Sequence, residues 1–452
     1  MNSQTEGLAA PRASAAAVTV ALCFGVMVIE GFDIQAMGVA APALGPELNL
    51  SREVLGQALS ASNIGLVIGA ILGGWFADLF GRKPVLIVSV AVFGLFTLMT
   101  MQATSFEMLF AARLLTGLGF GGALPNVMAI AADVSSESRR GSTAAMMFCG
   151  MPVGGSVVAL LSWLGYQGEW RPLFLIGGLI PLLLVPLLLI FMKETQKPEK
   201  GAAGASLFLP WLAAIPLGAA FWFLLDQAGR TPGMGSIGGA VAPWLGGVLG
   251  LLGAYMIVHR TPLFGGGRST ASILLWFTFF PTLVILYLVL NWLPTLVAAK
   301  GFEADASLAS VLFNVFSVAG ALCFGPLVDR FGLRWPLTGG FLGLVIVLIA
   351  LGQATDYFAI MALSGALGVF LLGCNYALYG AAASYYPPEM RGRGAGAAIA
   401  WGRLGAVVGP LIGGYLLQGG SAPGEVVYAM APFALAAALG VMLLSFARRP
   451  QA

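Results

Sequence analysis

The feature that most constrains this chain is a series of long apolar runs almost free of charge. Twelve of them fall into two groups of six, and each can cross a bilayer, which takes about 20 residues as an α-helix. Only 9% of the 452 residues are charged, whereas a soluble globular protein has about 25%. We therefore predict an all-α polytopic membrane protein in contact with the lipid bilayer. The expected spans are about 15–44, 54–77, 84–104, 108–132, 141–166, 172–192, 270–298, 307–328, 335–354, 357–383, 394–418 and 425–447.

Two further apolar stretches, 207–225 and 235–258, lie between the groups. Each is long enough to span, so we expect an added transmembrane hairpin and 14 helices in total. The alternative is 12 helices plus a hairpin that lies in the interface. The predicted organisation is a cytoplasmic N-terminal tail at 1–14, an N-terminal half at 15–192, a linker with the hairpin at 193–268, a C-terminal half at 269–447 and a cytoplasmic tail at 448–452.

The placement of basic residues predicts the orientation, because cytoplasmic loops carry an excess of Lys and Arg. With the N-terminus inside, the outer side holds only Arg52, Arg171, Arg230 and Lys300. Both termini are therefore expected in the cytoplasm. The cytoplasmic side then holds Arg12, Arg82, Lys83, Arg139, Arg140, Lys193, Lys197, Lys200, Arg260, Arg268, Arg330, Arg334, Arg391, Arg393, Arg448 and Arg449.

Two acids, Glu30 and Asp33, lie within the first apolar run and are three residues apart, so they share a helix face. A carboxylate at this depth is costly and usually faces a polar cavity. Two such acids in a poorly hydrated site resist joint ionisation, so one is expected to hold a proton near neutral pH. Gly31 thins the helix between them. We interpret the pair as the proton-coupling site; an acid pair fixed by a neighbouring cation for packing is the alternative.

The two halves repeat a loop after their second span. Gly74, Asp78, Gly81 and Lys83 recur as Gly325, Asp329, Gly332 and Arg334 at a constant offset, although the second copy has Leu333 where the first has Arg82. A Glu-Ser-Arg-Arg-Gly segment at 137–141 is echoed at 389–394. Such duplication indicates two parallel six-helix halves with a substrate site between them.

The loop from Gly74 to Lys83 resembles the G-x-x-x-D-x-x-G-R-K signature of the major facilitator superfamily. The segment Glu30–Asp33 resembles the D-G-x-D motif of the aromatic acid:proton symporters, with Glu first as in the hydroxyphenylpropionate-transporter branch. Residues 123–126, 148–154, 291–294 and 402–406 are also similar to that branch. The resemblance covers both halves but not residues 201–262, where the family has a short loop.

This resemblance implies the major facilitator fold and a secondary transporter of the bacterial inner membrane. It would import an aromatic carboxylate such as a benzoate, a phenylpropionate or a lignin-derived acid, with protons as the coupling ion. We expect no other cofactor, no nucleic-acid partner and a monomer. A proton-driven exporter of aromatic or drug-like compounds is the first alternative, and a sensing or scaffold protein is the second.

Two arginines lie within apolar spans. Arg403 is near mid-membrane, where a guanidinium needs an anion and its planar fork matches a carboxylate. We predict that it binds the substrate carboxylate; a permanent ion pair with Glu30 or Asp33 is the alternative. The resemblance places a functional Arg at Arg113, which would neutralise one of these acids unless it extends outward to the interface.

Other polar groups within the spans are candidates for contacting the ring or its hydroxyls, or for joining helices. They are Asn126, Tyr287, Asn291, Asn314, Asn375, Tyr376 and Tyr379. The repeated loops are predicted to be gating elements, with Asp78 forming a latch beside Arg82 and Lys83. That set comprises Gly74, Asp78, Gly81, Arg82, Lys83, Asp329, Arg330 and Arg334.

Enzyme and metal chemistry are not expected. His259 is the only histidine, and no nucleophile–base or metal-ligand spacing occurs. The glycines from Gly117 to Gly122 invite comparison with a phosphate-binding loop, but no strand precedes them. Small residues inside a membrane helix instead predict close helix packing.

Overall fold

The computed structural model describes residues 13–135, 140–165, 168–194, 268–386 and 391–447. Twelve helices within these ranges are long and apolar enough to cross a membrane. The predicted hairpin at 207–225 and 235–258 lies outside the described residues, so the 14-helix count stays a prediction, while the 12-helix bundle is observed. The first eleven spans are α1 (Ala13–Glu47), α2 (Arg52–Phe80), α3 (Arg82–Met101), α4 (Phe106–Val134), α5 (Arg140–Gly165), α6 (Arg171–Phe191), α9 (Ser269–Ala299), α10 (Ala306–Phe331), α11 (Arg334–Gln353), α12 (Tyr357–Ala382) and α13 (Arg391–Gln418). Two consecutive helices, α14 (Pro423–Tyr428) and α15 (Ala431–Leu444), together form the twelfth span.

Local sequence explains where these helices begin and end. Ser51 and Ser105 are the N-caps of α2 and α4, and each side chain accepts a hydrogen bond from the backbone N–H three residues on. Gly81 and Gly332 end α2 and α10 with φ of 94° and 75°, values that only glycine adopts at low cost. The repeated loop motif therefore builds the same turn in both halves.

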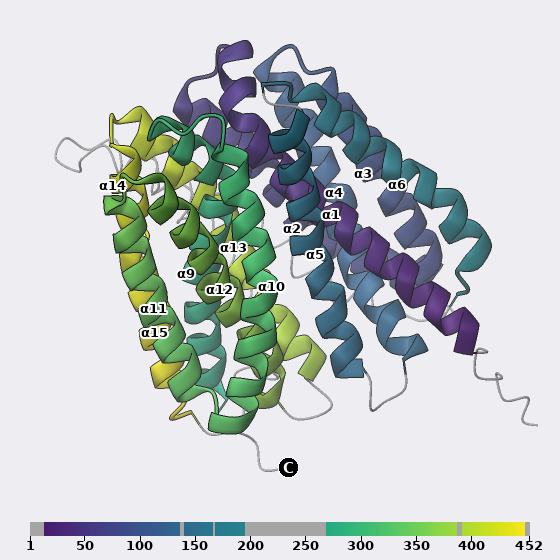
Figure 1. The fold of residues 1–452 in the computed structure, drawn as a ribbon. Helices are drawn as coiled ribbons and strands as arrows, with labels where there is room; N and C mark the ends of the chain where they lie inside the picture. The colour runs from purple at the N-terminus through teal and green to yellow at the C-terminus, as the bar shows by residue number, and fades with distance from the viewer. Residues whose placement is uncertain (1–12, 136–139, 166–167, 195–267, 387–390, 448–452) are drawn as a thin grey trace, which may run out of the picture.

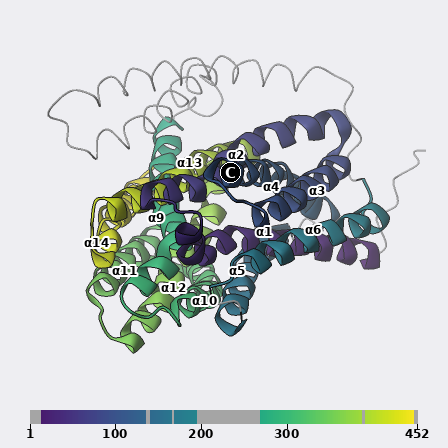
Figure 2. The same ribbon diagram turned by 90° about the horizontal axis from the view of Figure 1, so that it is seen from above.

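Helices α1–α6 and α9–α15 form two groups that lie side by side (Figures 1 and 2). Within each group the second and fourth spans pack through glycines, α2 on α4 and α10 on α12. A Cβ on Gly117 or Gly121 would lie closer than 3.0 Å to the backbone of α2, and one on Gly368 would do the same to α10. The Gly117–Gly122 segment is therefore a helix-packing surface, in agreement with the prediction.

Several hydrogen bonds join the two groups in the predicted outer half of the bundle. Ser60 Oγ donates to Val407 O at 2.8 Å, and Asn63 Nδ2 donates to Ala406 O at 3.1 Å, both from α2 to α13. Between α5 and the start of α10, Ser162 Oγ lies 3.0 Å from the hydroxyl of Ser307. In the described part of the chain, these contacts join the two halves on the predicted outer side of the pocket.

The repeated loops lie at the opposite end, and they do not form the expected latch. Asp78 is exposed and makes no ion pair with Arg82 or Lys83. Arg82 instead pairs with Asp133 at the end of α4, and Lys83 Nζ donates to Leu189 O at 2.9 Å. In this conformation Arg82 and Lys83 thus have partners other than Asp78, and a latch that breaks and re-forms as the halves move stays a prediction. These contacts join helices within the N-terminal half.

In the second copy, Asp329 is also exposed. Arg330 lies over the ring of Phe331 at 5.2 Å, and Arg334 lies over the rings of Trp335 at 4.8 Å and Phe446 at 4.5 Å. The basic residues of this loop therefore rest on aromatic rings at the end of the helices. A gating role for either loop stays a prediction.

Candidate functional site

Helix α1 lies between the two halves and carries both predicted acids. It packs on α5 of its own half and on α9 of the other half. A Cβ on Gly31 would lie closer than 3.0 Å to the carbonyl of Met151, and one on Gly38 would be equally close to Leu290 O. These glycines let the α1 backbone touch both neighbours, so Glu30 and Asp33 are held at the centre of the bundle.

Asp33 and Arg113 form a fully buried ion pair with two parallel hydrogen bonds. Arg113 Nη1 donates to Asp33 Oδ1 at 2.9 Å and Nη2 donates to Oδ2 at 2.6 Å. Thr97 of α3 also donates to Oδ1, at 3.0 Å. Both ionic side chains are 0% exposed, and Arg113 lies 5.7 Å from the centre of the Phe174 ring. Arg113 therefore neutralises Asp33 and does not extend outward to the interface.

Glu30 has different surroundings although it lies one turn away on the same helix. It is also 0% exposed, but neither carboxylate oxygen has a hydrogen-bond partner among the described residues. Its strongest charged neighbours are Arg403 and Asp33. Burying an ionised carboxylate without donors is costly. The site therefore suits a group that alternates between a proton and a nearby cation.

Arg403 of α13 is 7% exposed and reaches the same region from the other half. Its Nη1 donates to the Tyr287 hydroxyl, and its guanidinium carbon lies 6.0 Å from the centre of that ring. No carboxylate of the described residues lies within ion-pair distance of it, so a permanent pair with Glu30 or Asp33 is not present in this structure. Its guanidinium keeps donors that can bind an anion.

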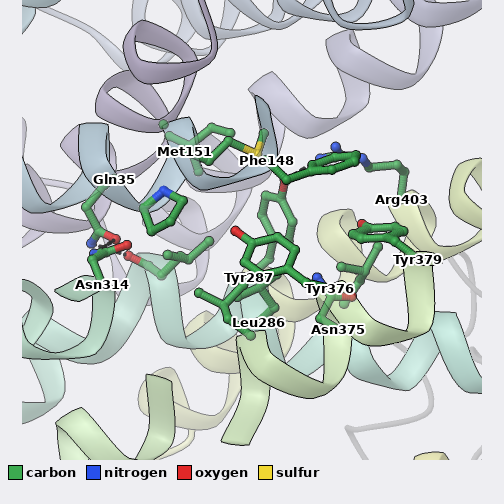
Figure 3. A pocket seen from close by; sticks show the side chains of 16 residues that line it. Gln35, Phe148, Met151, Leu286, Tyr287, Asn314, Asn375, Tyr376, Tyr379 and Arg403 are labelled. Carbon is green, nitrogen blue, oxygen red and sulfur yellow. Dashed lines mark hydrogen bonds between the residues drawn. The ribbon is translucent and has the colours of Figure 1, made fainter. Parts of the chain in front are cut away.

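A pocket lies between the halves and places Arg403 in its wall (Figure 3). Aromatic rings from both halves enclose it: Phe148 of α5 stacks on Tyr379 of α12 at 5.2 Å and 8°, and lies 6.1 Å from Tyr376. Flat rings of this kind suit a planar aromatic ligand. The lining residues are Gly31, Ile34, Gln35, Phe148, Met151, Pro152, Leu283, Leu286, Tyr287, Leu290, Asn314, Leu372, Asn375, Tyr376, Tyr379 and Arg403.

Two predicted contact residues do not reach this pocket. Asn126 Nδ2 donates to Gly122 O at 2.8 Å, one turn back in α4. Asn291 Nδ2 likewise donates to Tyr287 O at 2.8 Å within α9. Asn126 Nδ2 also lies 3.5 Å from Gly73 O of α2, so it joins two helices, which is the alternative role that the sequence left open. The amide of Asn291 bonds only within its own helix among the described residues.

Sequence reasoning missed three contributors to the site. Gln35 and Phe148 line the pocket, and Thr97 binds Asp33. Gln35 carried a usable signal, because it is a polar residue in the same apolar run as the two acids. Phe148 begins the segment 148–154 that resembles the aromatic acid transporter branch. Thr97 carried no signal, since Thr is an ordinary residue of a membrane helix.

The chemistry of the site is that of binding rather than bond cleavage. It combines a fixed ion pair, a carboxyl group without partners among the described residues, an arginine that can bind an anion and a set of aromatic rings. Within the described ranges no group of three or more His, Cys, Asp and Glu side chains could hold a metal ion.

Comparison with known proteins agrees with this arrangement. The model of the Major Facilitator Superfamily matches residues 23–308 and 271–452. The chain is 34% identical over 432 residues to the 3-(3-hydroxy-phenyl)propionate transporter of Escherichia coli, covering 94% of this chain and 93% of that protein. It is 33% identical to the 4-hydroxybenzoate transporter PcaK of Pseudomonas aeruginosa, with 93% and 90% covered. It is 31% identical to a gallate transporter of Pseudomonas putida, with 94% and 91% covered.

Solved structures show the same fold at low sequence identity. A partially occluded, inward-open structure of the xylose transporter XylE from E. coli has a TM-score of 0.64 at 17% identity, covering 96% of this chain and all of that one. An inward-facing bacterial homologue of the lysosomal transporter Spinster has a TM-score of 0.67 at 15% identity, covering 95% and 96%. The relatives are transporters rather than enzymes, and the chain belongs to the Major Facilitator Superfamily, on the branch of its aromatic acid transporters.

Proposed function

We propose that this protein imports an aromatic carboxylic acid together with protons across the bacterial inner membrane. The observation that carries the proposal is the pairing of the buried charges. Asp33 and Arg113 satisfy each other, whereas Arg403 in the pocket wall has no carboxylate partner among the described residues. A substrate carboxylate would supply the anion that a buried guanidinium needs.

Charge balance connects the substrate to the proton. With Glu30 ionised and the pocket empty, the charges of Glu30 and Arg403 cancel across the site. A bound substrate anion cancels Arg403 instead, and Glu30 must then take up a proton to keep the centre neutral. Carrying net charge through the low-dielectric centre is unfavourable, so we expect one proton for each monovalent anion at this site.

The ring-lined wall supports an aromatic substrate. Phe148, Tyr376 and Tyr379 present ring faces or edges to the pocket, which gives apolar contact area at a low cost in side-chain entropy. The names of the relatives point the same way, since they describe transporters of hydroxyphenylpropionate, hydroxybenzoate and gallate.

The contacts between the halves support alternating access. They join the halves on the predicted outer side of the pocket, whereas the exposed Asp78 and Asp329 lie at the other end. In the proposed cycle this is an inward-facing state, from which the proton and the substrate leave on the cytoplasmic side. Substrate binding from outside requires the Ser60, Asn63 and Ser162 contacts to separate.

The test is uptake of labelled 4-hydroxybenzoate into vesicles that contain the purified protein, with an imposed inward proton gradient. We expect accumulation above the external concentration, which a protonophore abolishes. Glu30→Gln should exchange labelled for unlabelled substrate across the membrane but should not accumulate it. Accumulation that requires a proton gradient directed out of the vesicles, so that substrate enters as protons leave, would instead favour the exporter. Uphill uptake by Glu30→Gln would refute the assignment of the proton site.

A further inference from the structure

Two amide side chains occupy the end of the pocket away from Arg403. They are Gln35 of α1 and Asn314 of α10, which belong to different halves and line the same pocket. Figure 3 shows them together on the side opposite Arg403. Both are buried, so the hydrogen bonds that they already make determine what they can offer to a ligand.

The N–H donors of both amides are already used. Gln35 Nε2 donates to Leu290 O at 3.0 Å and to Ser310 Oγ at 3.4 Å. Asn314 Nδ2 donates to Gln35 Oε1 at 3.1 Å and to Ser310 O at 2.9 Å. A primary amide has two N–H donors, so neither side chain has one left. The carbonyls of Leu290 and Ser310 can only accept, which fixes the orientation of both amides.

The two amides can therefore form further hydrogen bonds only as acceptors. Gln35 Oε1 keeps a second lone pair, and Asn314 Oδ1 receives no hydrogen bond from the residues that the structure describes. Such oxygens attract an O–H group and repel a carboxylate. Arg403, at the other end, has donors only. The pocket is thus polarised along its length, with donors at one end and acceptors at the other.

We propose that Gln35 and Asn314 form a specificity-determining pair that accepts a hydrogen bond from a hydroxyl on the substrate ring. The inference rests on the proposed function, and it narrows the substrate class to hydroxylated aromatic acids. The carboxylate lies at Arg403 and the hydroxyl points to the amide pair. The same amides join α1 to α9 and α10 across the two halves, so the hydroxyl binds beside contacts that join the halves.

The test compares the affinities of purified protein for benzoate, 3-hydroxybenzoate and 4-hydroxybenzoate, measured by equilibrium binding. The wild type should bind at least one hydroxylated acid about 5- to 10-fold more tightly than benzoate, the size of one buried hydrogen bond. Gln35→Met and, separately, Asn314→Leu should reduce this ratio to about one. Asn126→Leu is the matched control, since it removes a buried amide outside the pocket and should leave the ratio unchanged.

The ratio is the decisive readout because a shift in the conformational equilibrium changes the affinity for all three acids alike. A wild-type ratio of one for both hydroxylated acids, or an unchanged ratio in the two pocket variants, would overturn the inference while leaving aromatic acid transport intact. If the wild type bound none of the three acids, the proposed function would fail as well.

Discussion

The two acids of α1 should respond in opposite ways to removal of their charge. Asp33→Asn takes away the carboxylate that receives two hydrogen bonds from Arg113, at 2.9 and 2.6 Å, and leaves a guanidinium buried without an anion. Breaking a buried pair in this way costs about 3–5 kcal/mol of the free energy of unfolding. Glu30→Gln removes no hydrogen bond, because neither oxygen of Glu30 has a partner among the described residues.

The assay is thermal unfolding of the purified protein in detergent, with both variants measured at one pH and one heating rate. We expect Asp33→Asn to lower the midpoint by about 3–5 °C, given the unfolding entropy typical of a chain of this length. Glu30→Gln should stay at or above the wild-type midpoint. Asp33→Leu combined with Arg113→Met should recover most of the loss, since the unpaired charge is then absent. Equal midpoints for Asp33→Asn and Glu30→Gln would refute the division of roles between the two acids.

Three other predictions follow from the packing and charges described above. Arg403→Lys should weaken substrate binding about tenfold or more, because it keeps the charge but loses the planar fork; isothermal titration or competition binding measures this. Gly31→Ala should lower the yield of folded protein in the membrane, because its Cβ would clash with the Met151 carbonyl. Gly25→Ala is the control and should not change the yield, since no atom lies within 4 Å of its Cβ; equal yields for the two variants would contradict this. Ser162→Cys with Ser307→Cys should form a disulfide under oxidation, as the two hydroxyls lie 3.0 Å apart, and should arrest transport until reduced; full transport in the cross-linked protein would refute closure of the outer end.

The spans could be predicted because long uncharged apolar runs leave few alternatives in a membrane. The expected span 54–77 corresponds to α2 at Arg52–Phe80, and 270–298 corresponds to α9 at Ser269–Ala299. The ends are also set by local signals, since Ser51 caps α2 and Gly81 ends it. Local chemistry therefore determines the boundaries of the helices without reference to the fold.

The direction of each side chain was much harder to predict. In a soluble helix the polar face marks the solvent, but a membrane helix is apolar towards lipid and towards its neighbours. The sequence therefore could not separate Asn314, which lines the pocket, from Asn126 and Asn291, which donate to backbone carbonyls outside it. The partner of Arg82 was hard to predict for a related reason, because Asp133 lies 51 residues from it along the chain.

The position of α1 between the halves explains how two neighbouring acids acquire different roles. Three residues advance a helix by about 300° and 4.5 Å, so the side chains of Glu30 and Asp33 diverge by about 60°. Asp33 turns towards α3 and α4 of its own half, where Thr97 and Arg113 bind it. Glu30 instead makes no hydrogen bond to any described residue. Rocking of the halves in the proposed cycle would leave the Asp33–Arg113 pair intact and change only the surroundings of Glu30. The protonation of this one carboxyl group would therefore couple the movement of the halves to substrate binding.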